Sequence, residues 1–108
     1  MFWNKKPQMQ QVFAGEIQRI GFVHAYTKVQ GYFAVVLDMP GQGLCIVRLV
    51  AHQMDHYEEL ALSKPGDSIR IEATPVTFSG TIGEVHAGPK HKVLGVKNFT
   101  MAEDARRP

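Results

Sequence analysis

The stretch AHQMDHYEELALSKPGDSIRIE, residues 51–72, decides the fold because it joins a short helix directly to a strand. Apolar side chains recur at spacings of three and four over residues 51–62, as in a helix that buries one side. Pro65 and Gly66 end that helix, since proline cannot continue a helix and glycine accepts a positive φ. From Ser68 onward apolar and polar residues alternate, which predicts a strand.

Three strand-like runs precede this stretch and one follows it. The strands are expected at residues 12–26, 32–38, 44–50, 68–78 and 92–100. In the first of them the apolar alternation changes phase near a glycine, which predicts a bulge or sharp bend. The segment 39–43, MPGQG, is a strong turn signal between the second and third strands.

A chain of 108 residues supports one hydrophobic core. We therefore divide it into a flexible N-terminal arm, residues 1–11, a single domain, residues 12–100, and a polar C-terminal tail, residues 101–108. Residues 79–91 are expected to form a long glycine-rich loop.

The order of three strands, a helix and two strands, with KPGDSIRIE leading into the fourth strand, resembles the oligonucleotide/oligosaccharide-binding (OB) fold of the single-stranded nucleic-acid-binding type. The resemblance spans residues 12–100 and implies an all-β protein, a five-stranded antiparallel Greek-key barrel with one short helix. In that fold the ligand face is usually strands two and three, flanked by the loops after strands one and four. Bacterial single-stranded DNA-binding proteins typically end in an acidic, hydrophobic-tipped tail that recruits partners, whereas this chain ends RRP; if it binds single strands, we expect an accessory or specialised binder without that recruiting role.

The net charge of +2 is small, but the charges are unevenly placed. No acid lies between Glu16 and Asp38 or between Glu84 and Glu103, whereas the expected helix holds three acids. This asymmetry fits a surface for a phosphate backbone, although chance asymmetry of a solvated surface remains open. The chain shows no apolar run that would span a membrane and no secretory signal, so we expect a cytoplasmic protein.

The register of the strand pairs predicts which residues face the core. Pairing Leu37 with Cys45 across the MPGQG turn aligns two further apolar pairs and places Cys45 in the core, buried and unreactive. Pairing Ala25 with Phe33 in the same way sends Phe22 and alternate residues after it to the outer face of strands one to three.

That outer face carries aromatic and basic side chains, which suit single-stranded nucleic acid because bases stack on rings while cations follow the phosphates. We expect non-catalytic binding there, with DNA favoured over RNA. The candidate binding residues are Phe22, His24, Tyr26, Lys28, Tyr32, Arg48, Lys90, His91 and Lys92. The alternative is a protein-interaction or homo-oligomerisation surface without nucleic-acid binding, centred on Val36 and Ile46.

The sequence gives little support to an enzyme, a cofactor or a metal site. His52 and His56 have a spacing that can share a metal, but no third ligand is convincing. No nucleophile and base, and no pair of carboxylates, forms a catalytic arrangement. We therefore expect a binding protein that needs no cofactor.

Overall fold

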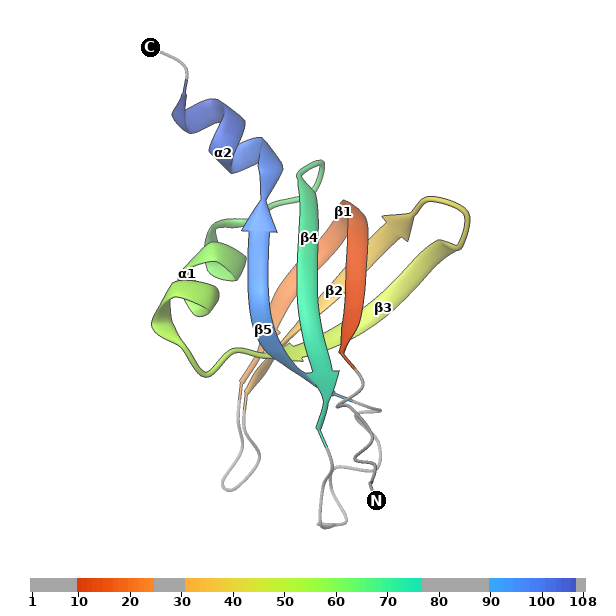
Figure 1. Ribbon diagram of the computed structural model, residues 1–108, viewed down its shortest axis with the longest axis vertical. Helices are drawn as coiled ribbons and strands as arrows, with labels where there is room; N and C mark the ends of the chain where they lie inside the picture. Colours follow the sequence, from red (N-terminus) through yellow and green to blue (C-terminus); the bar gives the residue numbers. More distant parts are fainter. Residues whose placement is uncertain (1–9, 25–30, 77–89, 107–108) are drawn as a thin grey trace, which may run out of the picture.

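The computed structural model describes residues 10–24, 31–76 and 90–106, and Figure 1 shows a small barrel with one helix at its side and one beyond its end. The strands are β1 (Gln11–Val23), β2 (Tyr32–Met39), β3 (Gly43–Val50), β4 (Ser68–Pro75) and β5 (His91–Asn98). The helices are α1 (Met54–Leu62) and α2 (Phe99–Ala105).

The five strands close into a barrel in the order β1-β2-β3-β5-β4. This confirms a mostly β fold with a helix between β3 and β4. The expectation of a wholly antiparallel barrel is wrong, because β3 pairs with β5 in parallel, at Leu49 with His91 and Val50 with Lys92. Parallel neighbours need a crossover between them, and α1 with β4 supplies it.

The β2–β3 hairpin has the predicted register. Leu37 pairs with Cys45, Val35 with Val47 and Phe33 with Leu49. Gly41 and Gly43 adopt φ of 81° and 82° in the turn, a conformation that glycine accepts without strain. Cys45 faces the core as predicted but is only half-buried. The buried apolar core consists of Ile17, Phe33, Val35, Leu37, Met39, Val47, Leu49, Leu60, Ile69, Ile71, Ala73 and Val93.

The predicted irregularity in the first strand is present, but the predicted pairing of β1 with β2 is wrong. Ile17 pairs with Leu37 and Ile20 with Val35, so the register shifts between them. One extra residue in this stretch lets two isoleucines three positions apart both face the core. As a result Phe22, which pairs with Phe33, lies on the core side of the sheet and not on its outer face.

The helices also differ from the sequence prediction. Helix α1 begins at Met54 rather than residue 51, and Gln53 at its N-cap makes no side-chain capping bond. Residues 101–105 belong to α2, where a polar tail was expected. The Asn98 side chain starts that helix by accepting a hydrogen bond from the backbone N–H of Met101 at 2.9 Å.

Asn98 is also the centre of a buried polar cluster that joins α1, the turn before β4, and β5. Its Nδ2 donates to Ser63 Oγ and to Asp67 Oδ2, both at 2.9 Å, and its backbone N–H donates to Glu59 Oε2 at 2.8 Å. Asp67 Oδ2 also accepts from the backbone N–H of Lys64 at 3.1 Å. The cluster therefore fixes the C-terminal end of α1 to the end of the barrel from which α2 projects.

Candidate nucleic-acid interface

The outer face of β1–β3 follows directly from the observed register. Three cross-strand rows lie side by side: Arg19, Val36 and Ile46; Gly21, Ala34 and Arg48; Val23 and Tyr32. We call the residues Arg19, Tyr32, Ala34, Val36, Ile46 and Arg48 the outer patch. Arg19, Gly21, Ala34 and Val36, with Ile20, line a shallow depression of about 260 Å³. The patch thus has an apolar floor with an arginine on either side.

Tyr32 and Arg48 are on the outer face, as predicted, and both are half-buried. Lys90 differs from expectation, because it is 2% exposed rather than part of a solvated loop surface. Its Nζ lies 4.8 Å from the centre of the Tyr32 ring, the geometry of a cation–π contact. Lys90 therefore supports Tyr32 from one side and brings a positive charge to that end of the outer patch.

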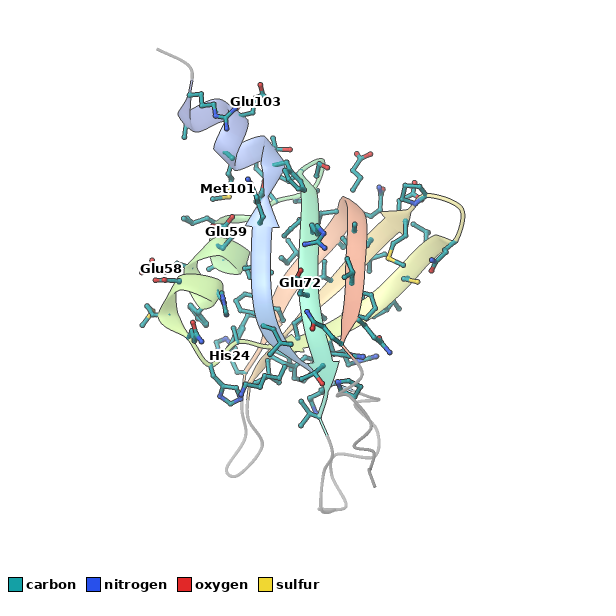
Figure 2. All side chains as sticks on the ribbon, viewed as in Figure 1. His24, Glu58, Glu59, Glu72, Met101 and Glu103 are labelled. Atoms are coloured by element: carbon teal, nitrogen blue, oxygen red, sulfur yellow. The ribbon has the colours of Figure 1, made fainter. Side chains whose placement is uncertain are left out.

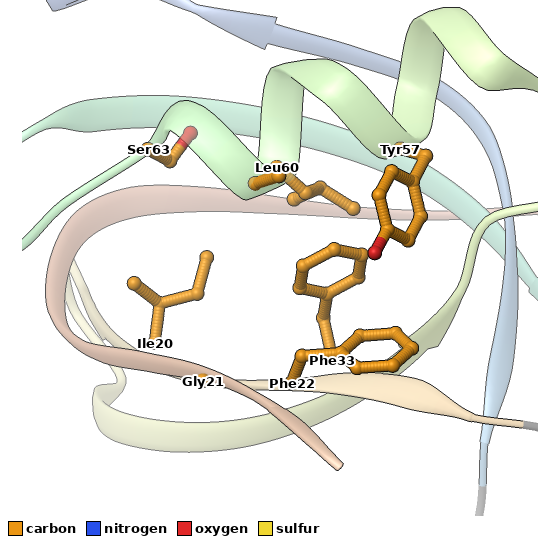
Figure 3. A pocket seen from close by; sticks show the side chains of 8 residues that line it. Ile20, Gly21, Phe22, Phe33, Tyr57, Leu60 and Ser63 are labelled. Atoms are coloured by element: carbon orange, nitrogen blue, oxygen red, sulfur yellow. The ribbon is translucent and has the colours of Figure 1, made fainter. Parts of the chain in front are cut away.

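Phe22 lies on the opposite side of the sheet, under α1. Its ring makes edge-to-face contacts with Phe33 at 4.9 Å and Tyr57 at 5.7 Å between ring centres. The three rings, with Ile20 and Leu60, line a pocket of about 190 Å³ between β1 and α1 (Figure 3). Phe22 is 37% exposed at the mouth of this pocket and cannot stack on a ligand of the outer patch.

The remaining described candidates lie at the end of β1 and at the start of β5. His24 is exposed just after β1 and contacts the Phe22 ring edge to face (Figure 2). His91 is half-buried and packs edge to face against Phe13. Lys92 is exposed and pairs with Val50, so it shares the outer side of the sheet with Tyr32. Tyr26 and Lys28 lie outside the described residues.

Positive and negative charges are separated along the sheet. Glu16 pairs with Asp38 in the outer-face row nearest the β2–β3 turn, and the described rows from Arg19 to Tyr32 contain no acid. Three more acids lie on α1, where Figure 2 labels Glu58 and Glu59. On β4, Arg70 is paired with Glu72 at 2.9 Å. Among the described residues of β1–β3, the charged side chains beyond that row are consequently the two arginines of the outer patch, and Lys92 and Lys90 continue the positive charge toward β5.

The sequence prediction overlooked Arg19 as a member of this surface. Its position depends on the register shift after Ile17, which reverses the side on which every later residue of β1 lies. The signal was available in the sequence, because Ile17 and Ile20 can both be buried only if one residue between them is bulged.

Burial lowers the pKa of His91 from its ordinary value of 6.5. Its Nδ1 is buried and makes no hydrogen bond in the structure. The neutral imidazole is therefore the favoured form at this position, which suits packing against Phe13 better than contact with a phosphate.

Within residues 10–24, 31–76 and 90–106, no three His, Cys, Asp or Glu side chains gather in a group that could hold a metal ion. The same residues include no helix that is long and apolar enough to cross a membrane. Comparisons of the chain with protein-family models, with curated proteins and with solved structures find no match.

Proposed function

We propose that the outer patch binds single-stranded nucleic acid without catalysis. The observation that carries the proposal is the arrangement of Arg19 and Arg48 on either side of an apolar depression, with Tyr32 at one end of the same face. A flexible strand can place its phosphates near the arginines while a base stacks on the tyrosine.

The charge pattern supports a direction for the strand across the sheet. Among the described residues of β1–β3, the two acids lie in the outer-face row nearest the β2–β3 turn, whereas Arg48, Tyr32 and Lys92 follow one another toward β5. A polyanion would be repelled by the acidic row and attracted along the basic residues toward β5. The closed five-stranded barrel is compatible with an OB fold, in which strands two and three form the usual ligand face. DNA rather than RNA is the preferred ligand in this proposal.

Lys90 has a different role from the one predicted for it. Because its ammonium group is buried against Tyr32, it orients the ring instead of reaching for a phosphate. One ring face is thus covered by Lys90, and the proposed base stacks on the other. Phe22 has no part in binding, since it packs under α1.

A protein-interaction surface is the second candidate. Leu44 and Ile46 on β3 are 68% and 61% exposed, and Ile46 continues the apolar row begun by Val36. Isoleucine and valine side chains favour a dry protein contact at least as much as a nucleobase.

Titration with short single- and double-stranded oligonucleotides at two salt concentrations tests the proposal. We expect Tyr32→Ala to weaken single-strand binding by about 1–3 kcal/mol with little change in salt dependence. Arg48→Gln should reduce the slope of affinity against salt, because fewer counterions are released. Arg70→Gln on β4 is the matched control for charge, and Phe22→Ala is the control for a ring beneath α1; both should leave binding unchanged.

The proposal fails if no single strand binds at low salt. It also fails if Arg70→Gln weakens binding as much as Arg48→Gln, since the interaction would then follow net charge rather than the outer patch. Loss of self-association or of a captured partner in Val36→Glu, without any oligonucleotide binding, would favour the second candidate.

A further inference from the structure

Most of strand β3 has one unpaired edge. On one side it pairs with β2 from Gly43 to Leu49, whereas on the other it meets β5 only at Leu49 and Val50. Among the described residues, no strand therefore pairs with the second edge of β3 over residues 43–48. Figure 1 shows this part of the β2–β3 hairpin extending beyond the barrel wall, on the side away from α1.

An exposed edge of this kind is a template for another strand, because its backbone N–H and C=O groups point outward. Proteins usually protect such edges with charges, prolines or bulges. Here residues 43–48, GLCIVR, contain one charge, Arg48, at the end next to β5. The two most exposed side chains of this segment are Leu44 and Ile46.

We propose that the edge of β3 binds the β3 edge of a second copy of this chain, antiparallel, with Ile46 facing Ile46 at a two-fold axis. Opposite residues of an antiparallel pair lie on the same face of the sheet, so outer-face residues must meet outer-face residues. With Ile46 at the axis, Leu44 of each copy lies opposite Arg48 of the other. The paired segment is then residues 44–48, which uses the open edge and stops before Leu49, where β5 begins.

Charge complementarity favours this register. Asp38 on β2 is exposed and lies opposite Leu44. Within one chain, Asp38 is four residues away from the row of Arg48, about 13 Å along the strands. In the dimer, Arg48 of the second copy lies in the row of Asp38, with only Leu44 between them, at about 10 Å between backbones. Its side chain can extend over Leu44, cover that apolar surface with its methylene groups, and meet the carboxylate.

The same register joins the apolar rows of the two copies. Val36 and Ile46 of one chain continue into Ile46 and Val36 of the other, so the exposed isoleucines cover each other. The two Asp38–Arg48 pairs lie on either side of this row. The open edge of β3 is thus self-complementary: its backbone can pair with a second copy, its apolar residues meet, and its charges are matched.

This inference does not depend on nucleic-acid binding. The dimer would place two outer patches on one continuous face, with Arg48 of each copy at the junction. Self-association is measured on the protein alone, so its absence and the absence of oligonucleotide binding are separate results.

Disulfide trapping tests the register. In a Cys45→Ser background, Ile46→Cys places two thiols directly opposite each other at a Cα separation of about 4.5–5.5 Å, within the range of a disulfide. Leu44→Cys in the same background is a matched control, since it is equally exposed but its two copies lie about 13 Å apart along the strands. We expect rapid oxidation of the Ile46→Cys protein to a covalent dimer and little for Leu44→Cys. Equal trapping of both variants would overturn the proposal.

Charge reversal provides a second test in the otherwise unaltered chain. Asp38→Arg and Arg48→Asp should each weaken self-association at least tenfold, measured by sedimentation. In either variant, residue 38 of one copy and residue 48 of the other carry like charges on either side of Leu44. The double variant Asp38→Arg/Arg48→Asp should recover association within about threefold of the original. A protein that stays monomeric at all accessible concentrations, or a dimer indifferent to these changes, would refute the inference.

Discussion

Removing the Asn98 side chain should destabilise the protein more than almost any other polar substitution in the described barrel. Asn98 is 0% exposed and makes three side-chain hydrogen bonds, to Asp67, to Ser63 and from Met101. The bond to the buried carboxylate of Asp67 is worth about 1.5–3 kcal/mol and the neutral bond to Ser63 about 0.5–1.5 kcal/mol. The N-cap bond of α2 adds about 1 kcal/mol.

Because these bonds share one residue, their contributions are not simply additive. We expect Asn98→Ala to lower the free energy of unfolding by about 3–5 kcal/mol, a large part of the total for a domain of this size. Urea unfolding followed by circular dichroism measures this change. Thr100→Val is a suitable control, since the Thr100 hydroxyl accepts a single exposed bond from Ser68, and its loss should cost about 1 kcal/mol or less.

Hydrogen exchange separates the two roles of Asn98. If it only caps α2, the Asn98→Ala variant will lose protection in residues 101–105 while the strands keep theirs. If its side chain also holds the C-terminal end of α1 to the barrel through Ser63, protection will fall at the end of α1 and around Asp67 as well. The reasoning about the buried cluster would be refuted if Asn98→Ala lowered the free energy of unfolding by less than about 1 kcal/mol and reduced exchange protection only in α2.

Two further predictions test the geometry of β1 and of His91. A Cβ at Gly15 would collide with the backbone carbonyl of Asp38, whereas a Cβ at Gly21 would meet nothing within 4 Å. Gly15→Ala should therefore lower the free energy of unfolding by about 2–4 kcal/mol in thermal or urea unfolding, and Gly21→Ala by less than about 0.5 kcal/mol; similar losses for the two variants would contradict the close approach of Gly15 to the Asp38 backbone. Burial lowers the pKa of His91 in the folded protein, so on acidification the unfolded chain binds a proton at this residue at a higher pH than the folded protein does. The contribution of His91 to the free energy of unfolding is therefore fully present above pH 6.5 and is lost as the pH falls through that value toward the lower folded pKa. Replacing His91 by Phe, which keeps a ring against Phe13, should flatten the dependence of unfolding free energy on pH in this window, and an unchanged slope would show that other groups cause it.

The sequence carried enough information for the barrel and for half of its register. Alternation fixes the β2–β3 hairpin because a slip of one residue would expose Leu37 and Val35 together. The helix before β4 follows from its periodicity and from the Pro65-Gly66 stop. The parallel pairing of β3 with β5 could not be predicted from local pattern, since it depends on how the chain returns after α1 and β4.

The candidate site was harder to predict because it depends on long-range packing. Lys90 follows a glycine-rich segment and was expected to be solvated, yet its ammonium group packs on Tyr32 and is buried. Helix α2 was missed because its seven residues have weak helical periodicity and its start depends on the tertiary position of Asn98. Burial and capping of this kind are set by neighbours distant in the sequence.

The bulge in β1 connects these observations, because one extra residue decides which chemistry the sheet presents. Without it, the odd-numbered residues after Ile17 would continue on the core side, so that Arg19 would be driven inward and Phe22 outward. The outer face would then offer an aromatic ring and no arginine beside Val36. With the shift, Phe22 instead closes the space beneath α1 against Phe33 and Tyr57. The same local irregularity therefore completes the core and gives the outer patch its second cation, which ties the proposed binding surface to the stability of the barrel.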